Sequence, residues 1–316
     1  MIGFCKRQWQ RFVATLSTVE DGAALALMRI AAGFALLVLV VPFVVSDAGA
    51  QIVGFVFVDD EFGGYRDLPG TEMMRVFGGP NPTTVSALLI TSLIAGICMV
   101  LGVFGRAPVL VAAVATRVVF GQNPDVSGGG DALLGNVLFL LLLGDCTHTL
   151  SLDCWWRTRR LVDETLIPAW PRKLALVQLA IMYTATGLQK LVSTTWTPLD
   201  GFSALYQILQ SPQWARFPWL IEAADGWLVV PMALGTLITI VWECSFWLVL
   251  VKRSWRWGYA VVGVGIHIGI IVLMEVGIFS WLSMALYPAM FPLAAAQLAR
   301  WIGAWTDPLP SAPPRS

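Results

Sequence analysis

Charged residues are scarce in this chain. Asp, Glu, Lys and Arg make up 13% of its 316 residues, whereas 57% of the residues are apolar. The mean hydropathy of +0.73 is too high for an ordinary soluble domain. Apolar runs recur from end to end, and a membrane-spanning helix needs about 20 such residues. The composition therefore predicts an all-α integral membrane protein whose helices span the lipid bilayer.

Residue types that bind metals or form disulfides are also rare. The two histidines, His148 and His267, fall at different predicted depths, so no metal centre is expected. The five cysteines lie in predicted spans or on the predicted cytoplasmic side, which predicts no disulfide framework outside. The sequence contains no HExxH motif, P-loop, GxSxG motif or dinucleotide fingerprint. The net charge of zero, with acidic outer loops, gives no reason to expect nucleic acid as a partner.

Eight apolar stretches qualify as transmembrane helices of a single bundle. The third is the weakest, because it is short and contains Arg117. We expect a cytoplasmic amphipathic N-terminus at 1 to 22, a membrane domain at 23 to 301 and a disordered cytoplasmic tail at 302 to 316. The predicted spans are 23 to 45, 83 to 104, 107 to 122, 132 to 149, 174 to 192, 227 to 251, 257 to 279 and 282 to 301.

The basic residues predict the orientation of these spans. Fourteen of the 20 lysines and arginines fall in the two termini and the even-numbered connections, when Arg300 at the end of the last span is counted with the C-terminus. Only Arg66, Arg75 and Arg216 fall in the odd-numbered connections, and the remaining three lie within spans. Because cytoplasmic loops carry the excess of Lys and Arg, both termini are predicted to be cytoplasmic.

Lys190 is the most unusual residue of the chain, because it lies in the apolar run 174 to 192. An ionisable residue inside a membrane is costly and usually functional. Burial disfavours the ammonium ion, so a buried lysine can act as a base near neutral pH. Tyr183 and Gly187 share its helix face, and Gly187 leaves room for another helix or a ligand. Alternatively, Lys190 extends its ammonium group to the membrane surface.

Further ionisable residues are predicted at the same depth as Lys190. Arg117, Asp131 and Glu275 fall in the outer half of their spans. A shared outward-facing cavity follows if their helices meet around Lys190. The alternative is that these charges pair with one another and only hold helices together.

Five more polar residues have a predicted place in the spans. His267 stands near mid-depth between Gly265 and Gly269, where it either supports the cavity or hydrogen-bonds across a close helix contact. The others are expected to form structural links: Arg29 with Glu243, or either of these with the inner pair. That inner pair, at the end of the fourth span, is Asp145 and His148.

Two outer segments, 46 to 82 and 193 to 226, are too long to be simple turns. The second is rich in tryptophan and interrupted by prolines, for example at Trp196 and Pro198. Such a segment is typical of an element that lies in the membrane interface and covers a cavity mouth. An aromatic belt that anchors the fold is the alternative.

Five segments carry a family resemblance when they are taken together and in order. They are LALMRIAAGFALL (25 to 37), MVLGVFGR (99 to 106), GDCTHTLSLD (144 to 153), IMYTATGLQKLVSTTW (181 to 196) and HIGIIVLMEVGIFSW (267 to 281). In combination they resemble the HTTM domain, which the vitamin K-dependent γ-glutamyl carboxylases share with many bacterial relatives. The resemblance covers roughly residues 20 to 300 and implies a multi-pass protein of the bacterial inner membrane.

The resemblance implies a role for Lys190, which occupies the place of the carboxylases' catalytic base. There, a reduced quinone of the vitamin K or menaquinol type is deprotonated and reacts with oxygen. The strong base so formed removes a proton from a glutamate side chain, and the carbanion takes up carbon dioxide. His267, Arg29, Asp145 and His148 match the family pattern too.

Two departures from the carboxylases bear on this chemistry. A carboxylase histidine at the start of the fourth span corresponds to about Gly130, beside Asp131. Glycine lacks the side chain with which that histidine can donate a hydrogen bond to a quinone oxygen. The outer C-terminal region that captures peptide substrates has no counterpart, because about 15 residues follow the last predicted span.

Three functions remain open on the sequence. The first is an enzyme of the carboxylase or epoxidase type, with Lys190 as the base and a quinol or lipid-like substrate. The second is a non-enzymatic membrane factor for export, maturation or immunity of an exported peptide or lipoprotein. The third, a small-molecule transporter, is weaker because the sequence lacks inverted repeats. The oligomeric state is not predicted.

The eight-span orientation predicts opposite sides for two single-cysteine substitutions in a cysteine-free background. Gly70→Cys should react with a membrane-impermeant thiol reagent added to intact cells, because the first outer loop contains it. Thr158→Cys should react only after the membrane is opened. Labelling of both positions from the same side contradicts the predicted topology.

Overall fold

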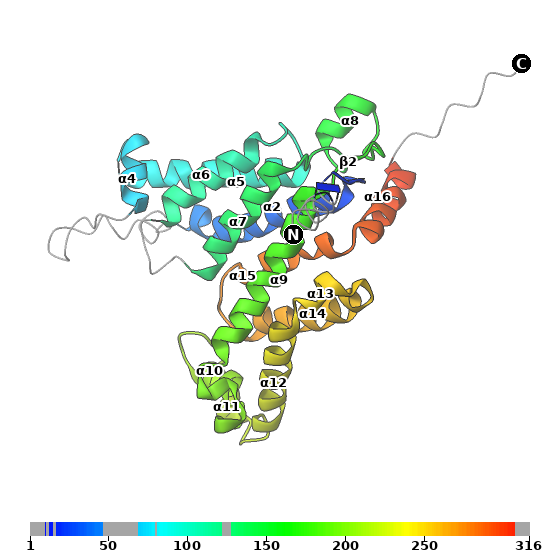
Figure 1. Ribbon diagram of the computed structural model, residues 1–316. Helices are drawn as coiled ribbons and strands as arrows, with labels where there is room; N and C mark the ends of the chain where they lie inside the picture. Colours follow the sequence, from blue (N-terminus) through cyan, green and yellow to red (C-terminus); the bar gives the residue numbers. More distant parts are fainter. Residues whose placement is uncertain are drawn as a thin grey trace, which may run out of the picture.

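The computed structural model describes residues 17–46, 69–79, 81–121 and 128–306, together with residues 10, 13 and 14. Most of the predicted amphipathic N-terminus and of the outer loop 46 to 82 lies outside the described residues, as does 307 to 316. The described part is helical apart from one small antiparallel sheet of β1 (Val19–Glu20) and β2 (Ile167–Pro168) (Figure 1). All-α architecture is therefore confirmed.

Four apolar helices form the first part of the fold. They are α2 (Ala23–Val45), α5 (Pro82–Leu101), α6 (Ala107–Phe120) and α7 (Gly129–Leu143), which pack side by side (Figure 1). The sequence fixes the ends of α5 locally. Asn81 accepts a hydrogen bond from the Thr84 backbone N–H at 2.8 Å, and Pro82 occupies the first turn. Gly102 ends the helix at φ 68°, a conformation that glycine adopts without strain.

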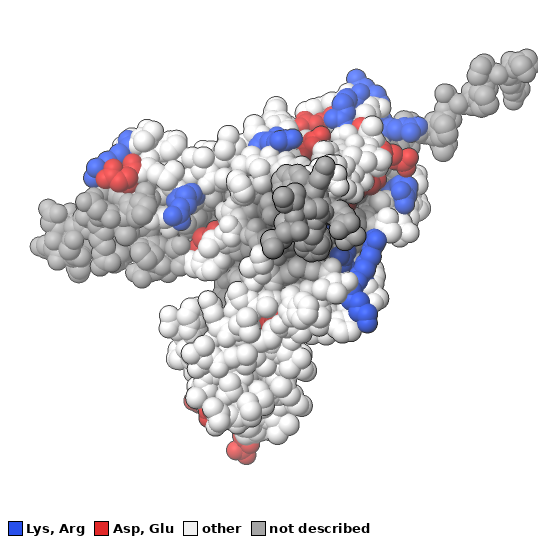
Figure 2. All heavy atoms as spheres, viewed as in Figure 1, with Lys and Arg blue, Asp and Glu red and all other residues white. Residues whose placement is uncertain are grey.

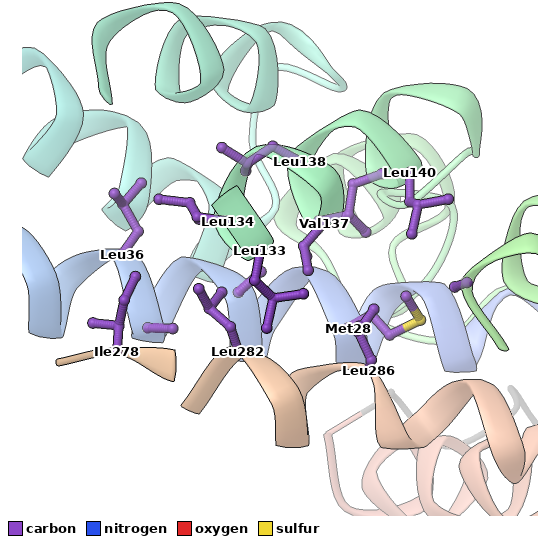
Figure 3. Packing of buried hydrophobic residues seen from close by; sticks show 14 of the residues in the cluster. Met28, Leu36, Leu133, Leu134, Val137, Leu138, Leu140, Ile278, Leu282 and Leu286 are labelled. Atoms are coloured by element: carbon purple, nitrogen blue, oxygen red, sulfur yellow. The ribbon is translucent and has the colours of Figure 1, made fainter. Parts of the chain in front are cut away.

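The main hydrophobic core lies around α2. Figure 3 shows Leu36 and Met28 of α2 facing Leu133 and Val137 of α7, with Leu282 of α15 (Phe279–Ala285) packed from the other face. These side chains are almost fully buried. The core thus joins helices that are far apart in the sequence.

A second group of helices carries the candidate site. α9 (Trp170–Lys190) contacts α7 and packs along α12 (Val229–Ser245), which contacts α14 (Arg256–Leu273). Gly187 permits the approach of α9 to α12, since a Cβ atom there would lie 2.7 Å from the Cys244 backbone nitrogen. The shorter elements are α4 (Pro69–Val76), α8 (Leu152–Thr158), η3 (Thr194–Trp196), η4 (Pro198–Asp200), α10 (Ala204–Gln210), α11 (Trp219–Ala223), α13 (Leu248–Val251) and η5 (Arg253–Trp255).

The predicted last span, 282 to 301, is not one straight helix. It is divided into α15 (Phe279–Ala285), η6 (Tyr287–Met290) and α16 (Pro292–Thr306), with a bend of 94° before α16. Proline at 288 and 292 removes backbone donors, which explains the break. α16 continues to Thr306, so the first residues of the predicted disordered tail are helical.

The described helices support a membrane protein. Three segments are long and apolar enough to cross a bilayer: α2, α5 and Arg253–Leu273. A fourth is added if the bent pair formed by Phe279–Met290 and α16 counts as one span. α6, α7 and α12 are apolar but shorter, and α9 has basic residues near both ends.

Charge is distributed unequally over the molecule. α4 and α8 lie at opposite ends of the bundle formed by α2, α5 and α6 (Figure 1). Figure 2 shows Lys and Arg gathered around α8 and near α13, whereas the face over α10 to α12 is largely uncharged with acidic residues at its tip.

We expect the substitution Gly187→Ala to destabilise the protein by about 1 to 3 kcal/mol, because the added methyl group forces α9 away from α12. Gly135→Ala is the matched control, since a Cβ atom at Gly135 of α7 meets no atom within 4 Å. Thermal unfolding in detergent should show a lower Tm for Gly187→Ala only. Equal Tm values for both variants would mean that the α9 to α12 contact is loose.

Candidate functional site

A cavity of about 720 Å³ lies between α9, α12 and α14. Its wall is mostly apolar, with residues such as Leu205, Ile208 and Ile270. The ionisable residues of the wall are Lys190, Glu243, His267 and Tyr183. An apolar cavity with a few convergent polar groups is the usual form of a small-molecule site.

Lys190 forms an ion pair with Glu243 at one side of the cavity. Its ammonium nitrogen lies 2.5 Å from Oε1 of Glu243, and the side chains are 28% and 10% exposed. The same nitrogen lies 4.6 Å from the centre of the Trp196 ring, a cation–π distance. Lys190 is thus held inside the site by two partners.

The predicted structural partners of Glu243 are wrong. Glu243 pairs with Lys190, not with Arg29, Asp145 or His148. The Gly187 contact explains this, because it brings the C-terminal end of α9 directly against the last turn of α12. An acidic residue within an apolar span was the sequence signal, but hydropathy does not show which helix faces it.

The second carboxylate oxygen of Glu243 has no hydrogen-bond partner among the described residues, although it is buried. A buried polar atom without a partner costs about 1 to 3 kcal/mol. Since Glu243 lines the cavity, a hydroxyl group on a bound molecule would satisfy this oxygen. The site is therefore suited to a largely apolar ligand that carries a hydrogen-bond donor.

A buried hydrogen-bond network fixes His267. Its Nε2 lies 2.6 Å from the Tyr183 hydroxyl, and its Nδ1 lies 3.1 Å from the Ser280 hydroxyl. The Tyr183 hydroxyl also lies 3.4 Å from that of Tyr287. The rings of Trp242 and Phe246 pack on Tyr183 at 4.5 and 4.6 Å between centroids. His267 thus has a fixed ring orientation at the cavity wall.

The two glycines beside His267 do not form the predicted close helix contact. A Cβ atom at Gly265 or Gly269 would meet nothing within 4 Å, and both residues line the cavity. Gly263 makes the close contact instead, where a Cβ atom would lie 2.5 Å from Cζ2 of Trp242. The GxxxG step therefore provides space for a ligand.

Three residues predicted to share the cavity lie outside its wall. Arg117 is exposed on α6, and Glu275 is exposed between α14 and α15. Asp131 accepts a hydrogen bond at 2.7 Å from the Gly128 backbone N–H at the start of α7. A similar predicted depth does not bring them to Lys190, because Arg117 and Asp131 lie on α6 and α7, which contribute no residue to the cavity wall, and Glu275 lies beyond the end of α14.

Arg29 lies in the N-terminal half of α2 and binds the backbone of two neighbouring segments. Its guanidinium group is fully buried and donates to the carbonyl oxygens of Met99 at 3.0 Å and Leu150 at 2.6 Å. Gly102 is required beside it, since a Cβ atom there would overlap the guanidinium group. Arg29 does not line the cavity, and its contacts indicate a structural role.

His148 lies in a cluster on the predicted inner side. Its Nδ1 lies 3.3 Å from Asp145, and its Nε2 lies 3.0 Å from the Thr165 carbonyl oxygen. Partial burial opposes ionisation of Asp163, yet hydrogen bonds from Thr165 and Arg157 hold the pKa of Asp163 below its usual value. The cluster connects the end of α7 to the segment before β2.

Gly130 leaves little room for the histidine that the carboxylases have near this position. Its Cβ atom would lie 3.2 Å from Cγ1 of Ile278 and from the Phe279 backbone nitrogen. Phe279 lines the cavity, so the start of α7 packs directly behind the cavity wall.

In the described part of the chain, no group of three or more His, Cys, Asp or Glu side chains has an arrangement that could hold a metal ion. The family model of the HTTM domain matches residues 18–294. The chain belongs to the HTTM family. In this HTTM protein the match covers α2 to α15 and every residue named in the cavity wall. No curated protein and no solved structure matches the chain.

The ion pair predicts a non-additive effect on stability. Lys190→Met should lower the free energy of unfolding by about 3 kcal/mol, because it leaves the Glu243 carboxylate buried without its cation. The double substitution Lys190→Met/Glu243→Leu should recover most of this loss. Lys252→Met is the control, since Lys252 lies 4.9 Å from the Trp255 ring centre and is exposed. Thermal unfolding is measured for the wild type, these three variants and the single variant Glu243→Leu, and a double variant whose loss equals the sum of the two single losses would rule out a coupled pair.

Proposed function

We propose that this HTTM protein binds a lipid-like molecule with an acidic hydroxyl group, and that Lys190 removes the hydroxyl proton. A reduced quinone of the vitamin K or menaquinol type is the leading candidate. The observation that carries the proposal is the Lys190–Glu243 pair in the wall of an apolar cavity. The unpartnered Glu243 oxygen supports it, because it offers an acceptor for the hydroxyl group.

The pair allows Lys190 to act as a base. A lysine can accept a proton only as a neutral amine, and Glu243 is placed to take the ammonium proton across 2.5 Å. In a site of low dielectric constant, charge separation is costly, so the neutral pair becomes accessible. The amine then takes the hydroxyl proton, and the new ammonium ion stabilises the oxyanion of the substrate.

The cavity fits a flat apolar ring. Gly265 and Gly269 leave one wall open, and Gly235 faces the same space from α12. A second groove, lined by Val241 and Gly258 among others, runs beside the cavity between α12 and α14 and shares Trp242 with it. This arrangement suits a ring in the cavity with an apolar tail directed to the bilayer. In the related carboxylases, a reduced quinone supplies the oxygen-dependent chemistry.

The proposal includes a membrane topology and a cellular location. Eight crossings, with both termini in the cytoplasm, place the cavity in the outer half of a single multi-pass domain at 23 to 301. A bacterial inner membrane is the expected location. An exported peptide or protein is then the natural acceptor for carboxylation, since the cavity would open toward the outside.

A second candidate function is non-enzymatic. Gly130 stands where the carboxylases have a histidine, and this departure favours a factor for export, maturation or immunity of a peptide or lipoprotein. In that case, the Lys190–Glu243 pair would hold α9 to α12 without proton transfer.

Lys190→Ala should reduce quinol-dependent oxygen uptake by the purified protein by about 100-fold or more, because the base is lost. Lys190→Arg should be equally inactive, since arginine keeps the charge beside Glu243 but does not release its proton. Lys252→Ala controls for the loss of an exposed lysine. Wild-type uptake in Lys190→Ala rules out the base, and activity retained only by Lys190→Arg indicates a purely electrostatic role. No uptake by the wild-type protein favours the non-enzymatic function.

A further inference from the structure

A smaller cavity, separate from the Lys190 cavity and the groove beside it, lies where η6 meets α16. Its volume is about 270 Å³, and it shares no residue with the wall of the Lys190 cavity. Its wall contains Arg253 of η5 and Arg256 of α14, together with Leu293 and Ala294 of α16. Gln297 completes the polar part of the wall. No acidic residue lines this pocket, so its charge is positive.

Hydrogen bonds hold one of the two arginines in place. Arg256 donates from Nε to the Val249 carbonyl oxygen at 3.0 Å and from Nη1 to the Met290 carbonyl oxygen at 3.1 Å. The charged groups that act on Arg256 are Arg253 and Arg172, and both are cations. Arg172 is itself paired with Glu20, at 2.5 and 2.7 Å. A bound anion would therefore relieve repulsion between Arg256 and Arg253.

The backbone adds positive potential at the same place. α16 begins at Pro292 after the 94° bend, so its first turn includes Leu293 and Ala294. The first N–H groups of a helix have no partner within that helix, and the helix dipole favours an anion there. The two arginines and the start of a 15-residue helix thus face the same small volume.

The pocket also has the features of a membrane interface. The rings of Trp257 and Phe291 lie against each other in its wall, with centroids 4.3 Å apart. Trp257 is 61% exposed and Leu293 is 65% exposed, so apolar surface continues outward from the basic groups. Tryptophan is typical of the level of lipid headgroups, and basic pockets on the cytoplasmic side of membrane proteins bind anionic headgroups.

We propose that this pocket binds the phosphate group of an anionic phospholipid from the cytoplasmic leaflet. Arg253 and Arg256 contact the phosphate oxygens, and the acyl chains lie along the exposed apolar surface next to Trp257 and Leu293. The positive-inside pattern places this connection at the cytoplasmic surface, where anionic lipids are available. The inference is independent of the chemistry at Lys190.

The test uses the full chain in detergent, with phosphatidylglycerol or phosphatidylcholine added stepwise and Tm as the readout. Phosphatidylglycerol should raise the Tm of the wild-type protein in a saturable way, and phosphatidylcholine should not. Arg253→Gln should need about fivefold more phosphatidylglycerol for half of the shift, because one headgroup contact is lost. Arg160→Gln is the matched control, since Arg160 is also an exposed arginine but lies near α8, and this variant should behave as the wild type.

Two further measurements make the result decisive. Gln297→Glu places a negative charge in the pocket at an exposed position of α16 and should abolish the shift, even if Arg253→Gln folds poorly. Inorganic phosphate and glycerol phosphate should not replace the lipid, and if they do, the site binds a soluble phosphate instead. Equal lipid responses in Arg253→Gln, Gln297→Glu and Arg160→Gln would overturn the proposal.

Discussion

The ion pair between Lys190 and Glu243 is the interaction on which the cavity depends. It requires α9 and α12 to meet closely, and Gly187 is the residue that permits this. Because an apolar site penalises any charge without a partner, neither side chain is readily exchanged alone. The same pair marks the wall of the cavity at which a ligand hydroxyl can be bound. The packing of α9 against α12 and the proposed chemistry therefore depend on the same two side chains.

The remainder of the site follows from how the helices pack around that pair. α14 contacts α12 through Gly263, and it leaves the glycine step at Gly265 and Gly269 facing the cavity. His267 lies between these features, with both ring nitrogens engaged by Tyr183 and Ser280. A packed contact and an open wall thus alternate along one helix. This alternation forms a cavity without interrupting α14.

The sequence predicted correctly those features that depend on a single helix. Hydropathy located α2, α5 and α14, and the stripe of Tyr183 and Lys190 correctly predicted a shared wall. Sequence-based prediction failed for features that depend on how two helices are placed relative to each other. Arg117 and Glu275 were predicted to share the cavity with Lys190 but are exposed outside its wall, since a position along the sequence does not fix the direction in which a side chain points. The bend before α16 was missed because the prolines lie within an otherwise apolar run.

The sequence by itself determined an all-α membrane fold, membership of the HTTM family and the unusual position of Lys190. Apolar length, the excess of basic residues in alternate connections and the ordered family segments are properties of the chain alone. Only the tertiary structure decided that Glu243 is the partner of Lys190 and that Arg253 and Arg256 meet the start of α16. A charge in an apolar environment requires a partner, but the identity of that partner depends on which helix faces come into contact.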